Sequence, residues 1–397
     1  MKRANAVFIC VLLTLQFFMA DGACAEPQVV GESAVLMDAK TGQVLYQKNP
    51  DKKMYPASTT KMLTALVALE RGNLEDEVTA SSNAVNTAGS AIGLQTGEKL
   101  TLEHLLYALM LVSANDAAEA IAEHLAGTVE QFCHIMNDTA RLMGARNTHF
   151  TNPHGLPDEN HYTTAYDLAV IARHAMKNTE FMKIAGAKSK IISRDDPEAW
   201  TDLYNHNSLL SRYEHAVGIK TGYTRVAQQC IVAAAEKDGR ELIAVVLKTK
   251  GVNIWSDAIT LLEYGFNNFQ PHKLIDMGEV VDRVKVNYSK EEIDLVAADH
   301  LYYNFPVGYQ PNLVQELELY DEPEASLDSG QVLGSLLLYE GDHYLTEVEV
   351  LASKEVKRPL STYWWFWVGI MTTTTLLMVT VLYLFMKLKR LKFRRIR

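Results

Sequence analysis

Apolar residues recur along the chain in several runs that are typical of β-strands. Strand-like runs over Ser33–Ala39 and Gln43–Lys48 flank a short turn that contains glycine, which predicts a β-hairpin. Later in the chain, the runs Val217–Thr224, Gln229–Ala235 and Glu241–Lys248 predict successive antiparallel strands, the last two joined by a tight turn. We expect these strands to form a sheet.

Helical spacing of apolar residues dominates the region between the hairpin and the later strands. Capping residues and periodic apolar faces predict a series of helices there. The predicted helices begin at Pro56 and cover Thr101–Met110, Asp116–Leu125, Val129–Met143 and Thr164–Lys177, with a closing helix at Ile254–Phe266. A sheet that carries a helical insertion is an α+β architecture.

From about Lys273 the pattern changes to short alternating runs. Examples are Val280–Val286, Gln315–Leu319 and Tyr344–Val350. These runs predict a small all-β domain at 273–355, which we interpret as a spacer between the main body of the chain and the segment that follows.

A charge-free apolar segment runs from Tyr363 to Met386, and as a helix it would reach about 36 Å, enough to cross a bilayer. Aromatic residues at its start and a basic tail at 387–397 predict a single transmembrane helix with the tail in the cytoplasm. A helix lying in the membrane plane is the alternative, but the segment has no polar face beyond Thr372–Thr375.

The first 25 residues are typical of an export signal. A basic start and an apolar core precede small residues up to Ala25, so we expect the mature chain to begin at Glu26, outside the cytoplasm. Cys24 raises the alternative of lipidation. The preceding Asp21-Gly22-Ala23 lacks the apolar residue that such processing uses, which favours simple cleavage.

Composition and charge exclude some classes of protein. Of the 397 residues 48% are hydrophobic, which indicates packed domains. The net charge is −10, and about −18 without leader and tail, so we expect no nucleic-acid partner. No cluster has metal-ligand spacing, and we expect no cofactor. For Cys133 and Cys230, a disulfide and two buried thiols are equal alternatives.

Ser58 and Lys61 form a candidate catalytic pair. A helix that opens near Pro56 places both side chains on one face, one turn apart. A hydroxyl near the positive end of the helix dipole, with an amine to take its proton, can act as a nucleophile and its base. By itself, this pattern is more often a helix cap followed by a solvated lysine.

Two more motifs follow in order. Ser113-Ala114-Asn115 falls at a break between predicted helices, and Lys220-Thr221-Gly222 lies on a predicted strand. The similar triplets Ser81-Ser82-Asn83 and Lys40-Thr41-Gly42 are interpreted as structural or chance matches, because the second precedes Ser58 and makes the hairpin turn.

The three motifs together resemble those of the serine penicillin-recognising enzymes. More narrowly, the chain resembles the low-molecular-mass penicillin-binding proteins, the D-alanyl-D-alanine carboxypeptidases of the S11 type, from about Ser33 to Phe266 and in the trailing β domain. The longer strings that carry this resemblance are Met37–Gly42, Pro56–Met62, Ser113–Ala118, Asn152–Pro157, His161–Ala169 and Gly218–Thr224. The resemblance implies a β-lactamase/transpeptidase-like α+β catalytic domain at 29–270, followed by the all-β domain and the membrane helix.

The resemblance also implies a reaction. Ser58 would attack the carbonyl of the penultimate D-alanine of a peptidoglycan stem peptide, with Lys61 as its base. Ser113 would pass a proton to the leaving amine, and water would then hydrolyse the acyl-enzyme. The same serine would be acylated by β-lactam antibiotics.

For substrate binding, the resemblance implies a further set of residues. Asn115 would hold the substrate amide, and Lys220 with Thr221 would meet the terminal carboxylate. Gly222 would let the substrate lie against the strand. Backbone N–H groups of Ser58 and Tyr223 would form the oxyanion hole. His154 and His161 are expected to be loop scaffolding.

Two departures from the family pattern leave alternatives open. Gln228 stands where glycine often follows alanine, and the stretch Lys248–Trp255 lacks an arginine that helps to clamp the substrate carboxylate. Lys250 is the candidate replacement, with a weaker, single-point contact. The alternatives are a weakly active penicillin-binding or wall-scaffolding protein, a β-lactamase-like hydrolase, and a transpeptidase or endopeptidase of the same fold.

Overall fold

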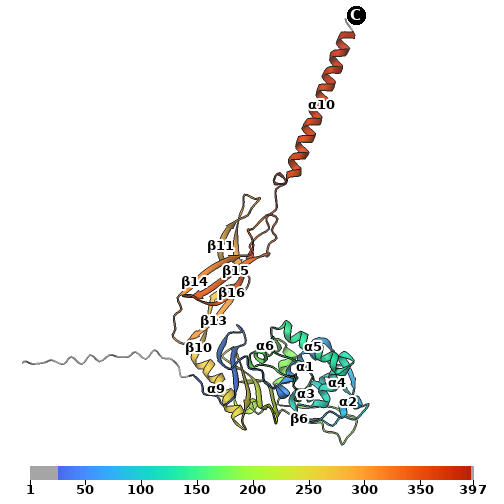
Figure 1. Cartoon of the computed structure of the whole chain (residues 1–397), viewed down its shortest axis with the longest axis vertical. Helices are drawn as coiled ribbons and strands as arrows, with labels where there is room; N and C mark the ends of the chain where they lie inside the picture. The colour runs from blue at the N-terminus through green and yellow to red at the C-terminus, as the bar shows by residue number, and fades with distance from the viewer. Residues whose placement is uncertain (1–25, 395–397) are drawn as a thin grey trace, which may run out of the picture. The chain divides into compact units, whose positions relative to one another are not determined.

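The computed structural model describes residues 26–394, so the predicted export signal lies outside the described residues. The described chain forms two compact units (Figure 1). The first unit runs to Met37 and then from Val44 to Asn268, and the second comprises Asp38–Gln43 and the chain from Phe269 onward.

A five-stranded sheet forms the centre of the first unit. Its strand order is β2-β1-β9-β8-β7, and the pairs β1–β2, β8–β9 and β7–β8 are antiparallel. The strands are β1 (Ser33–Asp38), β2 (Val44–Lys48), β7 (Ala216–Thr224), β8 (Gln228–Lys237) and β9 (Arg240–Thr249). The predicted hairpin and the later strands therefore meet in one sheet, with β7 at its edge.

Helices and short strands fill the stretch between β2 and β7. The helices are η1 (Ala57–Thr60), α1 (Lys61–Arg71), α2 (Ser82–Val85), α3 (Leu102–Leu111), α4 (Asn115–Ala126), α5 (Val129–Leu142), α6 (Ala165–Ala175), α7 (Thr179–Ala185) and α8 (Leu209–Arg212). The short strands are β3 (Glu77–Thr79) with β4 (Lys99–Thr101), and β5 (Ser189–Ile191) with β6 (Asp202–Tyr204). This arrangement confirms the predicted α+β class.

Threonine side chains mark where several helices begin. Thr101, Thr128 and Thr164 each accept a hydrogen bond from the backbone N–H three residues later, at the starts of α3, α5 and α6. These bonds satisfy N–H groups that have no partner within the helix. The helices predicted from Thr101 and Thr164 therefore begin one residue later, because each threonine is the cap.

The central sheet is covered on both faces. Helix α9 (Asn253–Asn268) packs against β8 and β9, and α6 packs on the opposite face (Figure 1). Residues 230–235 of β8 and 242–247 of β9 are all buried, whichever face their side chains point to. Continuous burial of this kind is expected for strands that lie between two layers, and it explains the uninterrupted apolar runs of the sequence.

The second unit contains an all-β domain, as predicted. β10 (Phe269–Ile275) pairs with β13 (Leu301–Pro306), and another sheet has the order β11-β12-β16-β15-β14. Its strands are β11 (Val280–Lys285), β12 (Glu292–Ala297), β14 (Leu313–Leu319), β15 (Val332–Glu340) and β16 (His343–Ala352). Alternating residues such as Ile293, Leu295, Val348 and Val350 are buried and form the core of this domain.

A long apolar helix ends the described chain. After the short η2 (Leu360–Thr362), α10 spans Trp364–Arg394. Its segment Trp364–Lys389 has a mean hydropathy of 1.9, none of it buried, and is long enough to cross a membrane. This candidate span overlaps the predicted transmembrane segment.

Cys133 and Cys230 are both buried and both free. The alternative of a disulfide between them is therefore not realised. Burial raises the pKa of each thiol to about 12, so neither is a reactive thiolate near neutral pH.

Asp257, on α9, attaches the start of the described chain to the sheet. Its carboxylate accepts hydrogen bonds from the backbone N–H groups of Val30 (3.0 Å) and Gly31 (2.9 Å) and from Thr249 Oγ1 (2.8 Å). Asp257 is buried, and an unpaired donor there would lose its hydrogen bond without gaining one from water.

Replacing Asp257 by alanine should lower the free energy of unfolding by about 3 kcal/mol, because it leaves three donors without their acceptor, two of them buried. Asp257→Asn keeps one acceptor oxygen and should cost less. Urea unfolding followed by circular dichroism measures both variants against the unchanged protein. Equal free energies for the alanine variant and the unchanged protein would contradict this role.

Candidate active site

Ser58 lies in the 3₁₀ turn η1, directly ahead of α1. Pro56 opens this turn, and α1 is buried along residues 61–68. Because α1 runs through the core of the unit, its first residue, Lys61, is drawn inside with it. Ser58 is half-buried, whereas Lys61 is 0% exposed.

The amine of Lys61 has three oxygen neighbours. Nζ lies 3.2 Å from Ser58 Oγ, 2.6 Å from Asn115 Oδ1 and 2.8 Å from the backbone carbonyl oxygen of His154. Within residues 26–389, no carboxylate forms an ion pair with Lys61. The three oxygens come from η1, α4 and the loop after α5, so Lys61 joins three parts of the unit.

Burial lowers the pKa of Lys61 well below its usual value of 10.5. The Lys220 ammonium lowers it further, and the Asp116 carboxylate opposes the shift. A lowered pKa makes the lone pair of the amine more readily available, as a general base requires.

Ser113 occupies the break between α3 and α4. Its φ is 63°, a left-handed backbone that costs a non-glycine residue about 1 kcal/mol. Its hydroxyl oxygen is buried and has no hydrogen-bond partner among the described residues. A strained residue with an unpaired buried hydroxyl is a candidate for contact with a reacting group.

Asn115 is held at both ends of its side-chain amide. Nδ2 donates to the carbonyl oxygen of Ala88 at 2.6 Å, which leaves Oδ1 to accept from Lys61. The backbone N–H of Asn115 also donates to the carbonyl oxygen of Ser90 at 2.6 Å. Because a side-chain amide carries two N–H groups, one is left for a ligand.

Asp116 shapes the loop beside this asparagine, a role that its position in the sequence does not by itself predict. Its carboxylate accepts hydrogen bonds from the backbone N–H groups of Ile92, Gly93 and Leu94 at 3.0–3.2 Å. Gly89 passes close to the asparagine, and a Cβ there would lie 2.7 Å from Asn115 Nδ2. The signal for Asp116 was its place in the string Ser113–Ala118.

Strand β7 passes directly beside Ser58. A Cβ added to Gly222 would lie 2.6 Å from Ser58 N and 3.0 Å from Thr59 N. Glycine is needed here because the backbones of β7 and η1 are in close contact. This requirement adds to the expected one, which is that Gly222 lets the substrate lie against the strand. Of the neighbouring motif residues, Thr221 is half-buried and Tyr223 is exposed.

Lys220 contributes a second buried amine. It is 2% exposed, and its Nζ donates to the carbonyl oxygen of Thr221 at 3.2 Å. Burial lowers the pKa of Lys220 to about 7. An amine that is buried without a carboxylate partner in the described chain is a candidate for binding an anionic group.

The loop after α5 encloses η1 from another side. His161 Nδ1 accepts from the backbone N–H of Thr151 at 3.1 Å, and His161 Nε2 lies 2.9 Å from Thr60 Oγ1. Gly155 has φ of 91°, and a Cβ there would overlap the carbonyl of Ala57. These contacts agree with scaffolding roles for the histidines of this loop.

The two similar triplets, Ser81-Ser82-Asn83 and Lys40-Thr41-Gly42, lie in structural positions. Ser81 caps α2 by accepting a hydrogen bond from the backbone N–H of Ala84. Lys40-Thr41-Gly42 forms the turn between β1 and β2, where Thr41 donates to Asp38 Oδ1.

The structure shows the local surroundings of both departures from the family pattern. Gln228 has φ of 57°, the left-handed conformation that favours glycine, so glutamine here is strained. Lys248 pairs with Glu32 at 2.7 Å and is thereby engaged elsewhere, whereas Lys250 is exposed.

Two family models match this chain. A model described as D-alanyl-D-alanine carboxypeptidase matches residues 21–251. The chain belongs to the D-alanyl-D-alanine carboxypeptidase family. The model for the C-terminal domain of penicillin-binding protein 5 matches residues 269–358, where the structure has its all-β domain.

Relatives within this family cover most of the chain. D-alanyl-D-alanine carboxypeptidase DacF of Bacillus subtilis is 34% identical over 373 residues, 90% of this chain and 95% of the relative. DacA of Haemophilus influenzae is 34% identical over 327 residues, 78% of this chain and 81% of the relative.

Solved structures show the same fold. Penicillin-binding protein 5 from Haemophilus influenzae has a TM-score of 0.74 and 31% identity, covering 84% of this chain and 99% of its own. A serine-to-alanine mutant of the Streptomyces K15 DD-transpeptidase has a TM-score of 0.58 and 34% identity, covering 61% and 99%. The predicted β-lactamase/transpeptidase-like domain is thereby confirmed.

Lys220→Met should make the protein more stable at pH 7, and this gain should shrink as pH rises. Between pH 7 and 10.5 the unfolded Lys220 is protonated while the folded one is neutral, so the unchanged protein gains up to about 1.4 kcal/mol per pH unit from this group. The variant has no amine at this position, so its free energy of unfolding lacks this dependence on pH. Urea unfolding at pH 7, 8, 9 and 10 measures the difference, and parallel curves would show that Lys220 keeps its ordinary pKa.

Proposed function

We propose that this protein is a serine-type D-Ala-D-Ala carboxypeptidase that removes the terminal D-alanine from peptidoglycan stem peptides and is acylated by β-lactams. The observation that carries the proposal is the environment of Lys61, which is wholly buried and 3.2 Å from Ser58 Oγ. The activity named for the relatives from Bacillus subtilis and Haemophilus influenzae supports the same substrate class.

The neighbours of Lys61 define where its lone pair points. Two of these neighbours, Asn115 Oδ1 and the backbone carbonyl oxygen of His154, can only accept hydrogen bonds. A neutral amine therefore donates its two N–H bonds to them and directs its lone pair toward Ser58 Oγ. In that state Ser58 donates its proton to Lys61 as its oxygen attacks the carbonyl of the penultimate D-alanine.

Backbone N–H groups at η1 and β7 would stabilise the oxyanion. The proposed donors are those of Ser58 and Tyr223, and the close approach of Gly222 to Ser58 N supports this assignment. As an edge strand, β7 has backbone groups free to pair with an extended peptide, which supports binding of the stem peptide alongside it.

The remaining residues would bind the ends of the substrate. We assign the terminal carboxylate to Lys220 and Thr221, and the substrate amide to the free N–H of Asn115. Ser113 would pass the proton from Lys61 to the nitrogen of the departing D-alanine as the C–N bond breaks. Water then cleaves the ester on Ser58 and restores the serine.

The nearest enzymatic alternatives differ in what attacks the acyl-enzyme. The likeness to a DD-transpeptidase makes transpeptidation the second candidate function, in which an amine instead of water attacks the acyl-enzyme. A β-lactamase would need a carboxylate that activates water. Two glutamates between Ser113 and Lys220 are the candidates for that role. Glu159 is exposed and Glu180 pairs with Lys183, which gives that alternative no support.

We also place the catalytic unit outside the cytoplasm, anchored by α10. The apolar span Trp364–Lys389 supports an anchor, and the basic residues that follow support a cytoplasmic tail.

The decisive measurement is D-alanine release from a pentapeptide that ends in D-Ala-D-Ala, with the full chain purified in detergent. Ser58→Ala should lower the rate at least about 10³-fold, because the acyl-enzyme cannot form. Release that survives this substitution would remove Ser58 from the mechanism. A stable penicillin adduct at Ser58 without any D-alanine release would favour the penicillin-binding or scaffolding alternative.

Lys250 should take part in carboxylate binding. The register Tyr223–Gln229–Thr249 across β7, β8 and β9 puts it at the same end of the sheet as Tyr223, two strand spacings or about 10 Å away. Lys250→Ala should raise KM for the pentapeptide about threefold to tenfold. Lys250→Arg should lower KM, because its planar fork binds a carboxylate at two points. An unchanged KM in both variants would exclude Lys250 from the site.

A further inference from the structure

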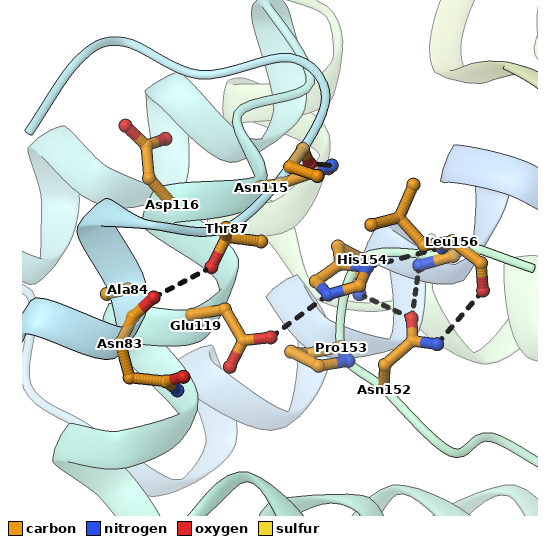
Figure 2. A network of polar contacts seen from close by, with 12 residues as sticks. Asn83, Ala84, Thr87, Asn115, Asp116, Glu119, Asn152, Pro153, His154 and Leu156 are labelled. Carbon is orange, nitrogen blue, oxygen red and sulfur yellow. Dashed lines mark hydrogen bonds and ion pairs between the residues drawn. The ribbon is translucent and has the colours of Figure 1, made fainter.

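A buried histidine–glutamate pair lies beside the site without contacting the amine of Lys61 through either side chain. His154 Nε2 lies 3.0 Å from Glu119 Oε1, and the two side chains point toward one another (Figure 2). They are 7% and 10% exposed. Glu119 belongs to α4 and His154 to the loop after α5, so the pair connects two elements that are distant in sequence.

The hydrogen bonds of His154 define its tautomer. Nδ1 accepts from the backbone N–H of Leu156 at 3.2 Å, so Nδ1 carries no proton. Nε2 therefore carries the proton and donates it to Glu119. Burial lowers the pKa of His154 although Glu119 opposes the shift, which agrees with a neutral ring. Both ring nitrogens are thus engaged.

The histidine holds a tight turn whose carbonyl faces Lys61. Asn152 Oδ1 accepts from the backbone N–H of Gly155 at 2.7 Å, and Asn152 Nδ2 donates to the carbonyl of Leu156 at 3.0 Å (Figure 2). Within this closed turn, the carbonyl oxygen of His154 accepts from Lys61 Nζ at 2.8 Å. The direction of that carbonyl therefore depends on the hydrogen bond from His154 to Glu119, which attaches the turn to α4.

Helix α4 positions both oxygens that accept hydrogen bonds from the amine of Lys61, one directly and one through the His154 turn. Asn115 offers its own oxygen to Lys61, and Glu119, four residues later on the same face, holds the turn that offers the other. Shifting either support would turn the lone pair of Lys61 away from Ser58.

Glu119 is costly to keep in this position. Its Oε2 is buried and has no hydrogen-bond partner in the described chain, so a carboxylate there loses hydration without full compensation. Packing alone would be served better by an apolar residue. This cost favours a role beyond stability.

We propose that Glu119 and His154 are positioning residues that hold the His154 carbonyl and thereby aim the lone pair of neutral Lys61 at Ser58. The inference rests on the proposed function, in which Lys61 is the base. It adds a hydrogen-bonded support that touches neither Ser58 nor the amine through a side chain.

Acylation of the full chain by a fluorescent penicillin tests the proposal. Saturation kinetics separate the acylation rate constant from the dissociation constant of the initial complex, and the labelling amplitude gives the active fraction. Glu119→Ala removes the acceptor, Glu119→Gln keeps it without the charge, and His154→Asn keeps the contact with Leu156 but loses the donor to Glu119.

Glu123 provides a matched control. It lies one turn further along α4, accepts from Asn83 Nδ2 at 2.9 Å through Oε1, and also has an unpaired buried Oε2 in the described chain. No histidine or lysine depends on it through these contacts, so Glu123→Ala and Glu123→Gln repeat the chemical changes without the proposed consequence.

We expect Glu119→Ala and His154→Asn to lower the acylation rate constant about 10- to 100-fold, the size of effect that misplacing a catalytic group produces. The dissociation constant should stay within threefold. Glu119→Gln should restore most of the rate, and both Glu123 variants should acylate within threefold of the unchanged protein.

Some results would overturn the proposal. A purely structural role would lower the labelling amplitude and the unfolding temperature of Glu119→Ala and His154→Asn while leaving the rate constant of the active fraction unchanged. A Glu119→Gln rate as low as that of Glu119→Ala would show that the charge acts, not the hydrogen bond. If the unchanged protein, like Ser58→Ala, takes no label, the proposed function fails before this inference is reached.

Discussion

The structure of the site depends on keeping the amine of Lys61 away from water. Lys61 is the first residue of α1, and the apolar face of that helix draws it into the core, where it is 0% exposed. An ammonium buried without a carboxylate partner is expensive, so the neutral form is favoured instead. The same burial leaves the amine in need of hydrogen-bond acceptors, and α4 and the loop after α5 supply them.

Helix α4 and the loop after α5 can approach Lys61 because several residues around the site adopt unusual backbone conformations or allow close backbone contacts. Gly155 and Gly222 lie where a Cβ would overlap or crowd the backbone of η1. Ala57 and Ser113 have φ of 50° and 63°, although neither is glycine. Each such residue costs about 1 kcal/mol or more. The packed core of the first unit must offset that cost, and part of the backbone strain of the fold therefore lies around Ser58.

Much of this arrangement could be predicted from the sequence. Period-two and helical spacing predict the sheet, the main helices and the all-β domain, and the order of the motifs indicates which triplets belong to the site. Glu119 could not be predicted, because an acidic residue on an amphipathic helix is usually solvated, and its burial depends on a loop that is distant in sequence. The left-handed backbone of Ser113 also leaves no local signal, since serine gives no indication of positive φ.

Burial of Lys220 offers a physical reason for trimming chain ends in the proposed reaction. With its pKa lowered to about 7 and no carboxylate partner in the described chain, Lys220 forgoes much of the free energy that an ammonium gains from water. A terminal carboxylate would supply the missing charge partner inside the site. An uncharged, internal peptide unit would leave the amine unpaired and buried. In the proposed reaction, this cost would become a preference for the free carboxyl end, and that preference would separate a carboxypeptidase from an endopeptidase of the same fold.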